Sequence, residues 1–148
     1  MHRRAYVATA GTVLAGGCLN ARTRSEEDSD PTVIDSMGEN VDVVVTITAE
    51  PSFDPDSVEI EVGETVGWKN DDHRIQTVTA YESEIPDDAE YFASGGYSRE
   101  VIATIIYPFR GGIDPEKGFT HTFETRGRYE YYSIPSEHLG MVGEVIVQ

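Results

Sequence analysis

The sequence predicts an all-β protein, a Greek-key sandwich of about seven to eight short strands. Two observations lead to this prediction. From Val41 onward, apolar and polar residues alternate with a period of two, and prolines and glycines separate the alternating runs. No long stretch has the 3.6-residue period of an amphipathic helix. The pattern is therefore typical of a β-sandwich with Greek-key connections.

The expected strands follow one another through residues 41–148. In the first, Val43, Val45 and Ile47 share one face, and polar residues such as Thr46 occupy the other. A glycine turn at Gly63 separates the second and third strands. The remaining expected strands are short β-prone runs at residues 58–62, 65–70, 77–80, 119–123, 129–133 and 141–147.

Residues 85–118 depart from this regularity. Prolines and the glycine pairs Gly95-Gly96 and Gly111-Gly112 predict a long excursion, with a short helix or strand around residues 99–106. The excursion contains a strongly apolar run. We expect it to cap one end of the sandwich with Ile102, Ile105, Ile106 and Tyr107.

The charge balance excludes some partners. The chain has 27 acidic and 11 basic residues, a net charge of −16, and its only lysines are Lys69 and Lys117. Such a surface repels the phosphates of nucleic acids, so we expect no nucleic-acid partner. It suits a halophilic protein, because the Debye length falls to about 3 Å in molar salt. An ordinary acidic secreted protein is the alternative.

The first 18 residues have the features of an export signal. Arg3-Arg4 precedes a weakly apolar run that ends in Leu14-Ala15-Gly16-Gly17-Cys18. The run is too short to span a bilayer, which needs about 20 residues. Residues 1–18 are expected to be a twin-arginine lipoprotein signal with Cys18 as the lipidated lipobox cysteine, although Leu14 lies one place too far from it. The alternative is a buried helix with a stray cysteine.

The polar, acidic residues 19–40 lack apolar periodicity and are expected to form a disordered tether. A lipid on Cys18 would make the membrane a partner. It would hold a domain at residues 41–148 on the extracellular face of the cytoplasmic membrane.

Four segments of this domain resemble the cupredoxins, or blue copper proteins, most closely their halocyanin and plastocyanin branch. The resemblance implies a cupredoxin-like sandwich, which in this branch is usually a lipid-anchored electron carrier. The segments are Phe53-Asp54-Pro55-Asp56, residues 62–70, Thr77-Val78-Thr79-Ala80, and residues 127–143.

The resemblance also implies where copper would bind. The family holds copper with His, Cys and His in a plane and a weak axial Met. The equivalent positions here are Gln76, Ser133, Ser136 and Met141. A serine hydroxyl stays protonated at neutral pH, and Cu(I) prefers thiolate or imidazole. We therefore expect the type 1 copper site to be lost and no cofactor to be bound, with copper as the cofactor only if the family function is retained.

The remaining histidines leave one alternative open. His73 and His138 lie near the substituted positions in sequence, with Asp71, Asp72 and Glu137 beside them. They are either displaced ligands for Cu(II) or Zn(II), or solvent-facing loop residues. His121, between Phe119 and Phe123, is expected to be structural.

The sequence thus predicts a non-enzymatic, exported, lipid-anchored domain that acts as a cell-surface binding or accessory module. Its apolar end near Leu139 and Met141 is the expected docking patch for a membrane or surface protein. The alternative is copper-binding electron transfer through an altered site. A hydrolase using Ser133 or Ser136 has no supporting oxyanion-hole signature.

Overall fold

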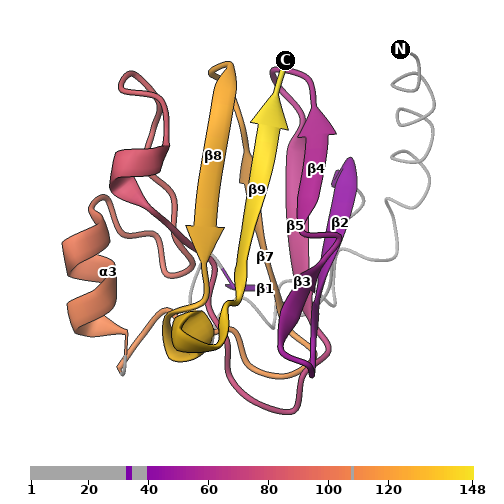
Figure 1. Cartoon of the computed structure of the whole chain (residues 1–148), viewed down its shortest axis with the longest axis vertical. Coiled ribbons are helices and arrows are strands. Elements are labelled where there is room, and N and C mark those ends of the chain that lie inside the picture. The colour runs from indigo at the N-terminus through magenta and orange to yellow at the C-terminus, as the bar shows by residue number, and fades with distance from the viewer. Residues whose placement is uncertain (1–32, 35–39, 108) are drawn as a thin grey trace, which may run out of the picture.

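The computed structural model describes residues 33–34, 40–107 and 109–148. The expected signal, with Cys18, lies outside the described residues, as does most of the expected tether. Two β-sheets pack face to face, with a helical excursion at one side (Figure 1). None of the helices in the described part is long and apolar enough to cross a membrane.

One sheet has five strands and the other has four. The order in the first is β1 (Val33–Ile34), β7 (Gly118–Thr122), β5 (Thr65–Asn70), β2 (Val43–Thr48) and β3 (Ser52–Asp54). The order in the second is β4 (Ser57–Ile60), β9 (Val142–Val147), β8 (Gly127–Tyr132) and β6 (Thr79–Ala80).

Sequence neighbours are often not sheet neighbours. β2 pairs in parallel with β5, and β4 pairs in parallel with β9, while the other ladders are antiparallel. These crossovers make the sandwich a Greek key, and the predicted all-β class is confirmed. β2 to β9 are the eight strands of the sandwich, and β1 adds two paired residues from within the range expected to form the tether.

Aromatic side chains fill the space between the sheets. Trp68 on β5 is fully buried and meets Tyr131 of the opposite sheet edge-on, with ring centroids 5.3 Å apart. Gly143 is opposite Tyr131 in the β8–β9 ladder, and a Cβ atom there would lie 2.6 Å from Tyr131 Cζ. The Tyr131 ring therefore occupies the space that any larger residue at 143 would need.

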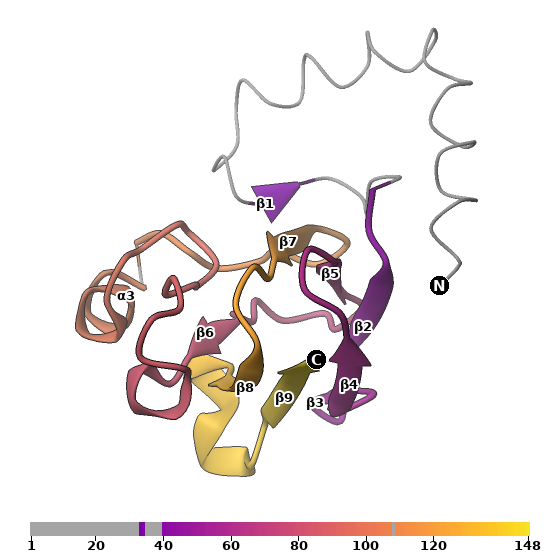
Figure 2. The ribbon, with the colours of Figure 1, turned by 90° about the horizontal axis from the view of Figure 1, so that it is seen from above.

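The excursion contains η1 (Glu82–Glu84) and α3 (Glu100–Ile106), so the helix expected near residues 99–106 is present. Figure 2 shows α3 at the side of the sandwich, beyond β6. Two reciprocal hydrogen bonds join η1 to α3, because Glu82 N donates to Glu100 Oε1 and Glu100 N donates to Glu82 Oε1. Tyr132 Oη donates to Glu100 Oε2 at 2.9 Å and so links α3 to β8.

The prediction that the apolar run of residues 102–107 caps one end of the sandwich is wrong for Ile102 and Ile105. Ile102 is 43% exposed and Ile105 is 62% exposed, and within α3 only Ala103 is buried. The helix rests on its small residue and turns its larger side chains outward. The hydrogen bonds of Glu82 and Glu100 join its N-terminal end to η1.

Candidate functional site

The four positions that correspond to the family's copper ligands come together at the end of the sandwich where η2 (Ile134–Leu139) lies. Gln76 lies in the loop between β5 and β6, Ser133 follows β8, Ser136 lies in η2, and Met141 precedes β9. All four side chains belong to buried residues, at most 4% exposed. The fold thus brings segments that are far apart in the sequence to one end of the sandwich.

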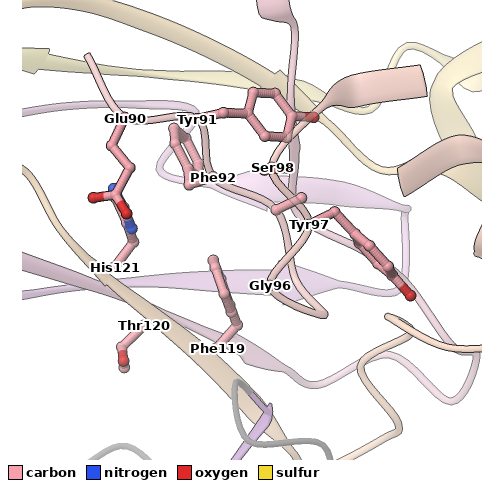
Figure 3. Close-up of a pocket in the computed structure, with 10 residues that line it drawn as sticks. Glu90, Tyr91, Phe92, Gly96, Tyr97, Ser98, Phe119, Thr120 and His121 are labelled. Carbon is pink, nitrogen blue, oxygen red and sulfur yellow. The ribbon is translucent and has the colours of Figure 1, made fainter. Parts of the chain in front are cut away.

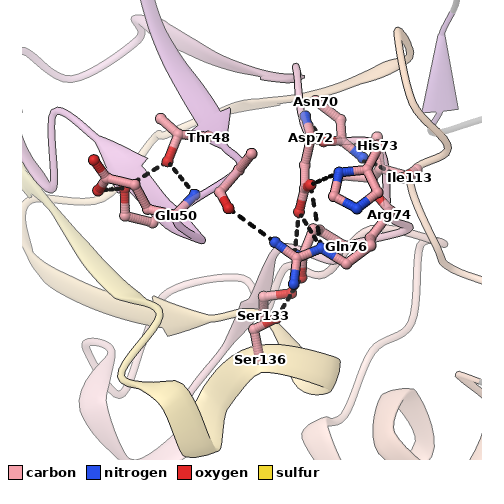
Figure 4. A network of polar contacts seen from close by, with 12 residues as sticks. Thr48, Glu50, Asn70, Asp72, His73, Arg74, Gln76, Ile113, Ser133 and Ser136 are labelled. Carbon is pink, nitrogen blue, oxygen red and sulfur yellow. Dashed lines mark hydrogen bonds and ion pairs between the residues drawn. The ribbon is translucent and has the colours of Figure 1, made fainter.

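Hydrogen bonds connect three of these side chains directly (Figure 4). Ser133 Oγ donates to Gln76 Oε1 at 2.7 Å, and Ser136 Oγ donates to the same oxygen at 3.0 Å. The backbone N–H of Thr77 donates to Ser133 Oγ at 2.9 Å. One amide oxygen thus joins two hydroxyls where the family places a metal ion.

A buried carboxylate holds the other end of Gln76. Gln76 Nε2 donates to Asp72 Oδ2 at 2.8 Å, and Arg74 Nε donates to the same oxygen at 3.0 Å. Burial alone would raise the pKa of Asp72, but the hydrogen bonds from Gln76 and Arg74, with the charge of Arg74, outweigh it and lower the pKa. Asp72 is therefore an ionised acceptor that fixes the amide orientation of Gln76.

The backbone of the loop is closed by its own hydrogen bonds. Ser133 N donates to Met141 O at 3.2 Å, and Met141 N donates to Ser136 O at 3.3 Å. Gly140 ends η2 with φ of 86°, a left-handed conformation that favours glycine. Ile134 N donates to Thr77 Oγ1, which joins this loop to the segment after Gln76. The ligand positions are thus held rigidly.

Comparison with known proteins agrees with this geometry. Residues 39–148 match the family of copper binding proteins described as plastocyanin/azurin. The chain belongs to that family. Plastocyanin of Scenedesmus fuscus is 30% identical over 110 residues, which cover 72% of this chain and all of the plastocyanin.

Solved structures give the same fold. A purple cupredoxin from Nitrosopumilus maritimus is 26% identical, with a TM-score of 0.50, over 72% of this chain and all of that one. The Cu(I) form of an amicyanin mutant is 20% identical, with a TM-score of 0.56, over 82% of this chain and 95% of that one. Cupredoxins are electron-transfer proteins rather than enzymes.

The donor set of this cupredoxin does not fit the copper that its family binds. Of the four ligand positions, only Met141 offers a soft atom. The oxygens of Gln76, Ser133 and Ser136 are hard donors and are already hydrogen-bonded to one another. In the described parts of the chain, no three His, Cys, Asp or Glu side chains gather as a metal-binding group.

The two loop histidines occupy different settings. His73 Nδ1 lies 3.1 Å from Asp72 Oδ1, and its side chain is 78% exposed. His138 lies in η2 and is also exposed. A displaced metal site that uses both stays a prediction.

His121 lies in a second polar and aromatic region, on β7 (Figure 3). Its ring stacks on Phe92 and meets Phe123 edge-on, with centroids 4.7 Å apart in each case. Burial lowers the pKa of His121 to about 4, so the ring is neutral at pH 7. It lines a pocket of about 290 Å³ with Glu90 and Tyr91. These contacts agree with the structural role expected for it.

The expected docking patch divides in two. Leu139 is 56% exposed, whereas Met141 is 1% exposed. Of these two side chains, only that of Leu139 is therefore available to a partner at this end.

Sequence reasoning missed the role of Asp72, which it placed among possible carboxylate ligands beside His73. The alternation of apolar and polar residues gives no signal for a buried acid in a loop. A short polar run before Gln76 is compatible with a metal-binding carboxylate and equally with a buried acceptor for the Gln76 amide.

Proposed function

We propose that this chain is a cupredoxin that has lost its type 1 copper centre and serves as a binding or accessory module at the cell surface. The observation that carries the proposal is the buried contact between Gln76 Oε1 and the hydroxyls of Ser133 and Ser136. That contact satisfies polar atoms which would otherwise be buried without partners.

The energetics favour the metal-free state. Each such hydrogen bond contributes about 1 kcal/mol net, and leaving its partner buried and unpaired costs about 1–3 kcal/mol. A copper ion would have to displace these bonds and would gain only hard oxygens and one thioether. Without a redox centre the domain does not carry electrons, so its remaining role is recognition.

The proposed location follows from the N-terminus. A lipid on Cys18 would anchor the domain to the extracellular face of the cytoplasmic membrane through the acidic tether. A membrane or surface protein would then dock at the η2 end, where Leu139 is exposed.

Copper titration of the full chain tests the loss of the metal site. We expect no absorption band near ~600 nm and no bound metal in native mass spectrometry, because no thiolate lies in the site. An intense blue band would disprove the proposal. Binding without colour would point instead to His73 and His138, and a His73→Ala variant would then lose the metal.

The second candidate is copper-binding electron transfer through an altered site. Membership of the copper-binding family and the retained, buried Met141 favour it. It requires a reversible voltammetric response from the copper-loaded protein, which the metal-free module does not give.

A further inference from the structure

The outward face of α3 and the segment after it is apolar, whereas the surface of a protein in water is normally polar. Val101, Ile102 and Ile105 of α3 are 52%, 43% and 62% exposed, and Phe109, shortly after the helix, is 86% exposed. A helix that lies on a domain normally turns polar residues to water and apolar residues to the core. A cluster of large exposed apolar side chains marks an interaction surface.

A hollow lies beside Phe109. It has a volume of about 290 Å³, and Ile75, Tyr107 and Phe109 itself form its apolar walls. Its two charged lining residues, Arg110 and Asp114, are of opposite sign. Gly111 and Gly112 also line it and have no side chains to fill it. An exposed aromatic ring therefore stands next to a hollow with room for an aromatic ring.

The local charge favours the approach of an acidic molecule. Residues 101–113 contain no Asp or Glu and form the longest such run in residues 40–148. The chain as a whole carries −16. Two copies of this chain repel each other least where these runs face one another.

We propose that this surface is the contact of a symmetric homodimer, in which Phe109 of each copy fills the hollow of the other. The ring of Phe109 and the hollow lie side by side on one molecule. A two-fold axis beside Phe109 therefore places the ring of each copy in the hollow of the other. A buried aromatic anchor in a pocket is the usual centre of a stable interface. The dimer does not depend on whether copper binds.

Sedimentation equilibrium of the full chain, made unlipidated by Cys18→Ser, tests the proposal in molar salt. We expect the mass to rise with concentration from 16.3 kDa towards twice that value. Phe109→Ser should weaken association at least about tenfold, because it removes the anchor. The matched control is Val62→Ser, which changes an apolar residue of 43% exposure elsewhere and should leave association unchanged.

A cysteine cross-link tests the geometry independently. In the same Cys18→Ser background, Ile105→Cys keeps the Phe109 anchor and places the chain's one thiol on the proposed contact face, where Ile105 is 62% exposed. Mild oxidation with oxidised glutathione should then give a disulfide-linked dimer, whereas Val62→Cys should associate without forming a disulfide between the copies. Circular dichroism confirms that each variant is folded.

Three results would overturn the proposal. One is a wild-type chain that stays monomeric up to about 100 μM, a range that covers ordinary micromolar association. Another is a Phe109→Ser variant that associates as strongly as the wild type. The third is a monomer that sediments with phosphatidylglycerol vesicles only when Phe109 is present, since a lipid surface would then be the occupant.

Discussion

At the scale of single residues, the positions that correspond to the family's copper ligands form a buried, hydrogen-bonded cluster. Gln76 presents its carbonyl oxygen to two serine hydroxyls and its amide nitrogen to Asp72. Each substitution alone would leave a buried polar atom unsatisfied, and together they satisfy one another. The four positions therefore lie together as the family correspondence requires, while three of their side chains bond to one another.

Refilling the site should restore the colour of the family. The triple variant Gln76→His, Ser133→Cys and Ser136→His should bind copper and give an intense band near ~600 nm, because these positions already converge on Met141. Visible absorption during copper titration measures this. The control keeps Ser133 and changes only Gln76 and Ser136 to His, and it should lack the intense band. A folded but colourless triple variant would contradict the residue correspondence.

At the scale of elements, strand β7 of the sandwich and helix α3 beside it differ in how they are held. The ring of His121 on β7 is packed between Phe92 and Phe123. Helix α3 is fixed at its N-terminal end by carboxylates and leaves an apolar face open. The burial of His121 on β7 is expected to make stability depend on pH, whereas the exposed apolar face of α3 is the surface proposed to bind a second copy.

His121 should make the protein less stable in mild acid. Its pKa is about 4 in the fold and about 6.5 when exposed, so between these values the unfolded chain binds the extra proton. The free energy of unfolding therefore falls as the pH drops from about 6.5 to about 4. Denaturant unfolding at several pH values measures this free energy. In His121→Phe, the decrease between about pH 6.5 and about pH 4 should be smaller than in the wild type. His138→Phe is the control, because the His138 side chain is exposed on η2. Identical pH profiles for His121→Phe and the wild type would disprove this assignment.

At the scale of the whole molecule, the chain combines an expected export signal, an expected acidic tether and a sandwich that ends in a polar core. Because Val33–Ile34 pair with β7, residues 19–32 would form the tether and would let the domain move near the membrane with an average reach of about 20 Å. Both proposed contact regions, Leu139 on η2 and Phe109 after α3, belong to connections between strands rather than to the sheets.

Lipidation should decide where the molecule resides. In cells that lipidate exported proteins, we expect the wild type in the membrane fraction and Cys18→Ser in the soluble exported fraction, because acyl chains supply the membrane affinity. Immunoblots of fractionated cells measure this. Arg3→Lys with Arg4→Lys should instead leave the protein inside the cell. A wild type that is found in the soluble fraction would contradict the anchor.

The sequence by itself determined the all-β class, because a period of two in hydrophobicity requires one buried and one exposed strand face. The resemblance to the cupredoxins likewise identified Gln76, Ser133, Ser136 and Met141 as the positions that correspond to the family's copper ligands. The family was also visible in these local patterns.

Only the tertiary structure decided what those residues do. The shared acceptor Gln76 Oε1, the buried Asp72 beneath it and the inward position of Met141 depend on contacts between distant loops. The outward turn of Ile102 and Ile105 was mispredicted because an apolar run does not reveal which side of a short helix finds a neighbour. Local patterns encode secondary structure, whereas the satisfaction of buried polar atoms is a property of the packed whole.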